Sequence, residues 1–261
     1  MTVISIVLTS MQFISLNNFQ GVYLMRKILI SNDDGIDSEA LARLAAMAKK
    51  FGEVWVVAPC RQFSSMSHAA NFWEPLKAWE VDFPVEGVHA FTTTGTPSDC
   101  VAFGITTVVP GRPDLVFTGI NKGYNIASGI QYSATVGAAL EAANQKIHTI
   151  AFSENHIGTH EVTDKYLEQL AAELIDKPLG DNEIWNVNFP GCTVEECKGI
   201  KYGCTISQES FFTGSYKEIG KEGYKTIYMV ELVPDWKGAE GTDLAAITDN
   251  YISVGKVRNY C

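Results

Sequence analysis

The stretch Arg26-Lys27-Ile28-Leu29-Ile30-Ser31-Asn32-Asp33-Asp34-Gly35 decides how this chain folds, because an apolar run leads directly into two adjacent aspartates. The apolar residues at 28–30 predict a buried strand, and the pattern after Gly35 predicts a helix. Neighbouring carboxylates repel each other, so a strand end that holds both needs a positive group nearby. A hard divalent cation meets that need, since oxygen ligands suit Mg²⁺, Mn²⁺ or Ca²⁺. The alternative is a solvated turn, in which an aspartate merely caps the helix.

Short apolar segments alternate with helix-like segments as far as about Phe189. The predicted strands are 27–31, 54–58, 114–118, 147–152 and 183–188, and the predicted helices are 38–51, 98–108, 134–145 and 162–176. The strands are almost continuously apolar, as strands covered on both faces are. The alternation predicts an α/β fold: a three-layer, Rossmann-like, mostly parallel sheet that binds ligands beyond the carboxyl ends of its strands.

Three segments depart from this alternation. The aromatic-rich residues 73–93 predict a β-hairpin excursion, and the looser pattern of residues 191–261 predicts a C-terminal arm with the closing elements of the same domain. Strand signals at 201–207 and 225–233 have little core of their own, so we expect the arm to pair with another subunit. Residues 25–190 form the predicted core. Residues 1–24 lack Lys and Arg, which favours an extension with a mis-assigned start before Met25 over a secretory signal.

Composition narrows the function classes. The chain has 261 residues, 46% of them hydrophobic, and a net charge of −10 from 30 acidic and 20 basic residues. That balance argues against a nucleic-acid polymer as the main partner, because phosphate backbones require clustered Lys and Arg. Six cysteines without a Cys-x-x-Cys pair predict free thiols in the reducing cytoplasm. No run of 18 apolar residues is present, so no membrane span is expected.

Polar loops follow the other predicted strands. One loop after the second strand is rich in hydroxyls and includes Arg61, Ser64 and His68, and a glycine-rich loop at 118–125 follows the third. Ser133-Ala134-Thr135 opens a predicted helix, where hydroxyls and backbone N–H groups make an anion site. A cation site beside an anion site suggests metal-assisted phosphoryl hydrolysis. His68 is a further candidate, as a proton donor to the leaving group.

Several separate motifs together resemble one known family. They are Arg26–Gly35; Val57-Ala58-Pro59 with Arg61 and Ser64; Gly95-Thr96-Pro97-Ser98-Asp99-Cys100-Val101; Pro113–Val116 with Gly119-Ile120-Asn121-Lys122-Gly123; Tyr132–Ala139; and Thr242-Asp243. In order and spacing the chain resembles the SurE survival-protein family of nucleotide phosphatases from Met25 almost to its C-terminus.

The resemblance implies a metal site and a substrate. One divalent metal ion per subunit, Mg²⁺ or Mn²⁺, would be held by Asp33, Asp34, Ser64 and Asn121. The substrate phosphate would lie among Asn32, Gly123, Ser133 and Thr135, with Asp33 and Asp34 as the catalytic pair. The implied reaction is hydrolysis of nucleoside 5′- and 3′-monophosphates to nucleoside and phosphate. The implied assembly is a homodimer or homotetramer that exchanges C-terminal arms.

Two departures from the family pattern keep other functions open. Cys60 stands where the family has Asp, and Ala134 stands where the family favours Gly, which tolerates positive φ better. A nucleotide-binding regulator without turnover is therefore one alternative. A dinucleotide-dependent oxidoreductase is the other, although Asn32-Asp33-Asp34-Gly35 replaces the Gly-x-Gly-x-x-Gly turn that such enzymes need.

Overall fold

A nine-stranded sheet forms the centre of the computed structural model, which describes residues 25–209 and 212–259. Its strands, in spatial order, are β3 (Ala78–Glu80), β4 (His89–Thr93), β2 (Gly52–Pro59), β1 (Arg26–Ser31), β5 (Leu115–Lys122), β6 (His148–Glu154), β7 (Glu183–Phe189), β11 (Ile252–Arg258) and β8 (Ile200–Cys204). Neighbouring strands are parallel except for the β3–β4 and β7–β11 pairs. The predicted extension over residues 1–24 lies outside the described residues.

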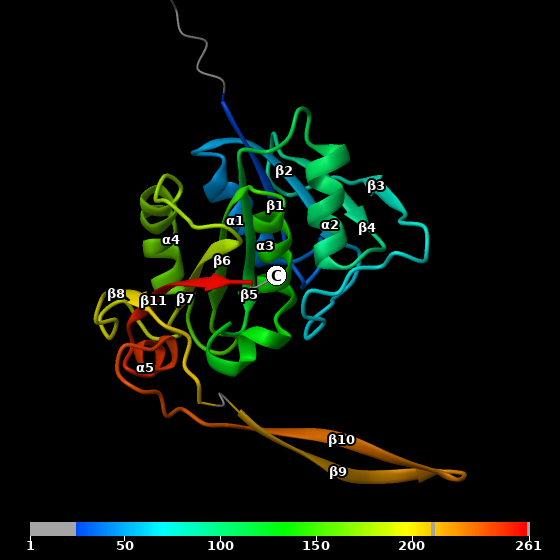
Figure 1. Cartoon of the computed structure of the whole chain (residues 1–261), viewed down its shortest axis with the longest axis vertical. Coiled ribbons are helices and arrows are strands. Elements are labelled where there is room, and N and C mark those ends of the chain that lie inside the picture. Colours follow the sequence, from blue (N-terminus) through cyan, green and yellow to red (C-terminus); the bar gives the residue numbers. More distant parts are fainter. Residues whose placement is uncertain (1–24, 210–211, 260–261) are drawn as a thin grey trace, which may run out of the picture.

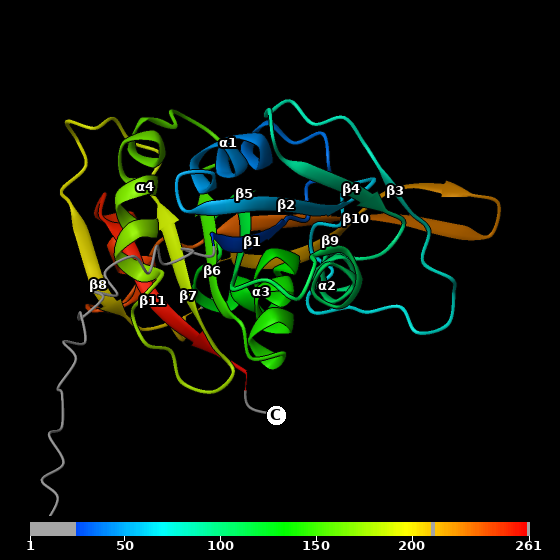
Figure 2. The same ribbon diagram turned by 90° about the horizontal axis from the view of Figure 1, so that it is seen from above.

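Helices cover both faces of the sheet, as Figure 2 shows. Helices α1 (Glu39–Ala48) and α4 (Glu161–Leu174) lie on one face, and α2 (Pro97–Phe103), its continuation η1 (Gly104–Val108) and α3 (Ala134–Asn144) lie on the other. Strand β1 illustrates why. Ile28 and Ile30 pack in the core with α1, whereas Leu29 points to the opposite core with α2 and α3. The predicted three-layer, mostly parallel fold is confirmed.

Residues 73–93 contain the predicted β-hairpin, and both of its strands belong to the main sheet. β3 and β4 do pair antiparallel, as the predicted hairpin requires. However, β4 also pairs in parallel with β2, so the segment extends one edge of the main sheet. The aromatic-rich segment predicted the hairpin but not its pairing with β2, because that pairing is a long-range contact.

The C-terminal residues divide between the body and an arm. β8 and β11 join the main sheet, and α5 (Asp243–Thr248) packs beside them. Only β9 (Phe212–Glu222) and β10 (Lys225–Pro234) leave it, as an antiparallel ribbon that extends from the body (Figure 1). The arm is therefore this hairpin alone, and its first strand, β9, was not predicted. None of the described helices has the length and apolar character needed to cross a membrane.

Candidate functional site

The turn after β1 presents the two aspartates. Asn32 closes this turn with both ends of its amide: Nδ2 donates to the Gly35 carbonyl oxygen at 3.0 Å, and Oδ1 accepts from the Gly35 N–H at 3.2 Å. Gly35 has φ of +100°, which a residue with a side chain rarely adopts. The buried amide of Asn32 thus shapes the backbone that carries Asp33 and Asp34.

The two carboxylates differ in their surroundings. Asp33 is only 3% exposed and accepts a hydrogen bond from the Thr135 hydroxyl at 2.6 Å. Burial, partly offset by that hydrogen bond and reinforced by the charge of Asp34, raises the pKa of Asp33 to about 6. Burial also raises the pKa of Asp34, against the effect of the Lys122 backbone N–H, which lies 3.4 Å from Oδ2.

The loop after β2 brings a hydroxyl beside Asp34. Gln62 Nε2 donates to Ser64 Oγ at 3.0 Å and lies 3.4 Å from Asp34 Oδ1, so it links the two side chains. The Phe63 N–H donates to the Asp33 carbonyl oxygen at 2.7 Å and fixes the loop to the end of β1. On its other side the loop lies against α3, where a Cβ on Gly137 would come within 2.4 Å of the Ser67 carbonyl oxygen.

The end of β5 supplies an amide. Asn121 Nδ2 donates to the Gly123 carbonyl oxygen at 2.9 Å, which leaves its Oδ1 as the group available to a cation. Gly123 has φ of +127°, and its N–H donates to the Glu154 carbonyl oxygen on β6 at 2.8 Å. A glycine is required here because the backbone turns sharply at the strand end.

Helix α3 begins at the same edge of the sheet. Ser133 is its N-cap, and its Oγ accepts from the Val136 N–H at 3.0 Å. Ala134 is the first helical residue and does not have positive φ, so the absence of the family's glycine does not strain this turn. The hydroxyl of Thr135 donates its hydrogen bond to Asp33.

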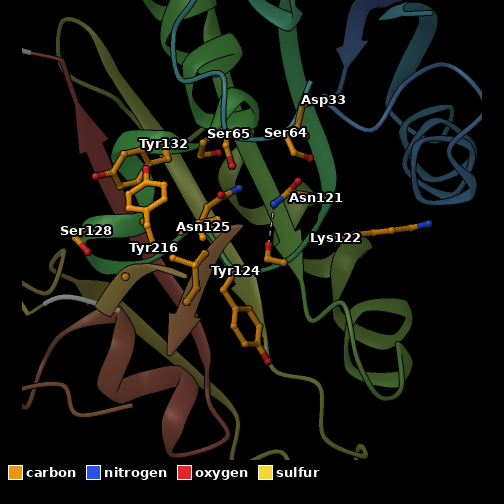
Figure 3. A pocket seen from close by; sticks show the side chains of 16 residues that line it. Asp33, Ser64, Ser65, Asn121, Lys122, Tyr124, Asn125, Ser128, Tyr132 and Tyr216 are labelled. Carbon is orange, nitrogen blue, oxygen red and sulfur yellow. Dashed lines mark hydrogen bonds between the residues drawn. The ribbon is translucent and has the colours of Figure 1, made fainter. Parts of the chain in front are cut away.

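These segments surround a cavity of about 750 Å³ (Figure 3). Of the side chains and glycines predicted for the site, Asp33, Ser64, Asn121, Gly123 and Ser133 line it. Asp34 is not part of the lining, but its side chain contacts Gln62 and the backbone N–H of Lys122, which lines the cavity. Asn32 and Thr135 do not line it either; Asn32 closes the turn at Gly35, and Thr135 hydrogen-bonds to Asp33. The structure therefore brings the predicted residues together from four separate loops.

The sequence model of the family described as "Survival protein SurE" matches residues 28–212. The chain belongs to the SurE family. Proteins named 5′-nucleotidase SurE from Clostridium botulinum (strain Loch Maree / Type A3) and Mesorhizobium japonicum are 36% and 35% identical to it, over 87% of this chain and 90% and 91% of their own length. The crystal structure of the SurE protein from Aquifex aeolicus superposes with a TM-score of 0.75 at 31% identity, covering 89% of this chain and 93% of that one.

The donor set at this SurE-family site suits a hard divalent cation. Two carboxylates, a hydroxyl and an amide oxygen are all oxygen ligands. In the described part of the chain, no Lys, Arg or His side chain lies within ion-pair distance of Asp33 or Asp34. Among the described residues, no three His, Cys, Asp or Glu side chains lie close enough together to hold a metal ion by themselves.

His68 points to α3 and not to the cavity. Its Nε2 lies 3.1 Å from Glu141 Oε2, and the histidine does not line the cavity. This contact helps to hold the Ser64 loop against the helix, and it lowers the pKa of Glu141. The geometry thus offers His68 a structural role in the SurE-family site.

Sequence reasoning missed part of the cavity wall. Tyr124, Tyr132 and Tyr216 line it together with residues of the arm, Gly214, Val230 and Leu232. The strand signal of β10 was visible in the sequence, but no pattern indicated that one face of the ribbon lines the same cavity as Asp33. That relation depends on how the ribbon leaves the body.

Proposed function

We propose that this chain is a metal-dependent phosphomonoesterase that hydrolyses nucleoside 5′- and 3′-monophosphates to nucleoside and inorganic phosphate. The observation that carries the proposal is the pair Asp33 and Asp34. Asp33 is buried and Asp34 is partly buried, and among the described residues no Lys, Arg or His side chain forms an ion pair with either, although the charge of Lys122 acts on Asp34 from a greater distance. Buried carboxylates of this kind require a cation. The names of the SurE relatives, 5′-nucleotidase, support the substrate class.

The metal would be one Mg²⁺ or Mn²⁺ held by Asp33, Asp34, Ser64 and Asn121. When bound, such an ion polarises a phosphoryl oxygen and lowers the pKa of water. Thr135 orients Asp33 toward it, and Gln62 keeps Asp34 and Ser64 beside each other. Asn121 presents its amide oxygen because its Nδ2 is used on Gly123.

The phosphate would bind at the start of α3. Ser133, the N-cap of α3, lines this end of the cavity, and an α-helix N-terminus favours an anion. Gly123 permits a close approach of the substrate from the β5 side. Asn32 and Thr135 contribute indirectly, by shaping the turn and by holding Asp33.

The test is phosphate release from 5′- and 3′-nucleoside monophosphates with Mg²⁺, with Mn²⁺ and with EDTA. We expect release that requires the metal and disappears in Asp34→Asn while the circular dichroism spectrum is unchanged. Asp37→Asn, an exposed aspartate in the following turn, is the matched control and should retain activity. Nucleotide binding without release would favour the regulator instead, and dinucleotide binding alone would favour the oxidoreductase. Full activity of Asp34→Asn would refute the assignment.

We also propose that the chain forms a homodimer or homotetramer through the β9–β10 hairpin. Large apolar side chains on this ribbon are exposed in the single chain: Ile219, Ile227, Met229 and Val233. An exposed ribbon with that composition is typical of a surface that pairs with a second copy.

A further inference from the structure

We propose that Cys192 and Cys197 are a modification site, a thiol pair that closes into an intramolecular disulfide when it meets a small disulfide such as oxidised glutathione. The pair lies in the segment that joins β7 to β8, and neither cysteine lines the cavity described above. The inference therefore does not depend on the proposed function. Both cysteines are free thiols and both are partly exposed, so a dissolved reagent has access to them.

One hydrogen-bonded turn lies between the two cysteines. The N–H and the hydroxyl of Thr193 donate to Glu196 Oε2 at 3.0 and 3.2 Å, and the Glu196 N–H donates to Thr193 Oγ1 at 3.3 Å. The Cys197 N–H donates to the Thr193 carbonyl oxygen at 3.1 Å, as in the first turn of an α-helix. This pattern is a capping box, in which the residues just before the cap and four positions after it pack together. Cys192 and Cys197 occupy those two positions.

Two further observations place the thiols on the same side of this turn. Both cysteine side chains pack against the main hydrophobic core. Burial raises the pKa of Cys192, and the neighbouring Cys197 raises it further, through its charge and through a hydrogen bond between the two side chains. Sulfur atoms in such contact can be joined with little movement of the backbone.

The segment is fixed to the body on both sides of the pair. Before it, the Gly191 N–H donates to the Tyr124 hydroxyl at 3.0 Å. After it, the Lys198 N–H donates to the Asn250 carbonyl oxygen at 2.9 Å. Because the backbone is held in this way, the second thiol stays beside the first. Ring closure then competes well with attack by a dissolved thiol, since it is an intramolecular step.

The reaction consists of two thiol–disulfide exchanges. Since the pKa of Cys192 is raised, Cys197 attacks first: its thiolate forms a mixed disulfide with the reagent and displaces one small thiolate. Cys192 then loses its proton and attacks Sγ of Cys197, and the second small thiolate leaves. The two small thiolates take up the two protons. The protein pair is oxidised by two electrons, and the reagent is reduced to two thiols.

The test treats the full-length protein with oxidised glutathione, blocks the remaining thiols with iodoacetamide, and measures peptide masses after trypsin. The tryptic peptide that ends at Lys198 contains Cys192, Cys197 and no other cysteine. In the wild type we expect this peptide to be unblocked and lighter by two hydrogen atoms, and dithiothreitol should reverse the change. Cys192→Ser should retain glutathione on Cys197, because the second thiol is missing. Cys60→Ser, which removes an exposed cysteine of another loop, should behave as the wild type does.

A second comparison tests whether the turn holds the thiols together. Glu195→Ala and Glu196→Ala each remove one exposed carboxylate, but only Glu196 closes the capping box. In buffers of oxidised and reduced glutathione, Glu196→Ala should lower the equilibrium constant for disulfide formation by roughly 2- to 10-fold relative to Glu195→Ala. Equal constants in these two variants would refute the role of the turn.

Three results of the mass measurement would refute the pair itself. In the first, both cysteines of the wild type are still blocked by iodoacetamide after treatment. In the second, glutathione remains on the wild-type peptide as it does on Cys192→Ser. In the third, the disulfide joins two chains, which a gel without reducing agent detects. None of these results bears on phosphate release, which is measured separately.

Discussion

Thr135 Oγ1 donates a 2.6 Å hydrogen bond to Asp33 Oδ1 between two buried side chains that lie 102 residues apart in the chain. The bond joins the first turn of α3 to the end of β1. It also lowers the pKa of Asp33 and so opposes the effect of burial. The hydroxyl therefore favours the charged form of this carboxylate, although burial still raises its pKa, and it occupies Oδ1 rather than Oδ2.

Thr135→Val should weaken metal binding by roughly 10- to 100-fold, the usual effect of removing a group that orients a metal ligand. The valine keeps the shape of threonine but cannot donate to Asp33. Thr135→Ser retains the hydroxyl and should bind Mn²⁺ nearly as the wild type does. Titration of the protein with Mn²⁺ measures both. Equal affinities in the valine and serine variants would contradict the role assigned to this hydrogen bond.

Gly137→Ala should destabilise the protein and slow phosphate release. In an ordinary helix this change would add stability, by up to about 1 kcal/mol. Here the new Cβ would lie 2.4 Å from the Ser67 carbonyl oxygen and 2.8 Å from the His68 Cα, so we expect a net loss of about 1–3 kcal/mol. Displacement of that loop also moves Ser64.

Urea denaturation and the phosphate-release assay measure these two effects. Gly220→Ala is the control, because a Cβ at Gly220 on β9 meets nothing within 4 Å. If Gly137→Ala is as stable and active as Gly220→Ala, the loop does not depend on close contact with α3.

Asp243→Ala should destabilise the protein by about 3 kcal/mol or more, since each unsatisfied buried N–H costs roughly 1–3 kcal/mol. Asp243 accepts from the N–H groups of Ala127, Ser207 and Leu244 at 3.0, 2.9 and 2.7 Å. These hydrogen bonds join three parts of the chain: η2 (Ala127–Tyr132), the segment before β9 that contains Ser207, and helix α5.

Asp243→Asn keeps one carboxamide oxygen and should lose less stability than Asp243→Ala. The free energy of unfolding of the three proteins, measured in urea, provides the comparison. An alanine variant within about 0.5 kcal/mol of the wild type would show that these contacts are not needed.

The free energy of unfolding should decrease below about pH 6.5, because His148 is buried in its neutral form. Burial lowers the pKa of His148 from 6.5, while its Nε2–H donates to the Leu174 carbonyl oxygen at 2.9 Å. The unfolded chain then takes up a proton at a higher pH than the folded one, so acid favours unfolding. The stability from the neutral ring is present above pH 6.5 and is lost as the pH falls toward the folded pKa.

The measurement is the free energy of unfolding at pH 7.5 and pH 5.5. In His148→Gln the decrease between these two values should be smaller than in the wild type. His156→Gln, which removes an exposed histidine, should behave as the wild type does. An identical decrease in all three proteins would exclude His148 as its source.

Replacing the hairpin over residues 214–232 by a short turn should reduce the molecular mass in solution to that of one chain. The main sheet keeps its β8 and β11 strands, because they pair within the body. Light scattering after size-exclusion chromatography measures the mass. A full-length protein that is already monomeric would contradict assembly through the arm.

The fold was largely predictable because its strands are covered on both faces and are apolar along their length. The apolar run at 28–30 predicted β1, and the helix patterns predicted α1, α3 and α4 to within a few residues at each end. The sequence did not reveal that β4 pairs with β2, because that pairing is a long-range contact. Strand β9 was missed because exposed ribbons carry no burial pattern.

The sequence alone determined that the first strand of an α/β sheet is followed by paired aspartates, and later strands by hydroxyl-rich and glycine-rich loops, because burial patterns and turn residues are local features of the sequence. Only the tertiary structure showed which contact each of these side chains makes. Thr135 holds Asp33, Asn32 closes the turn, and Tyr216 reaches the cavity from the arm. Such roles depend on the directions in which side chains from distant segments point, and no spacing along the chain encodes them.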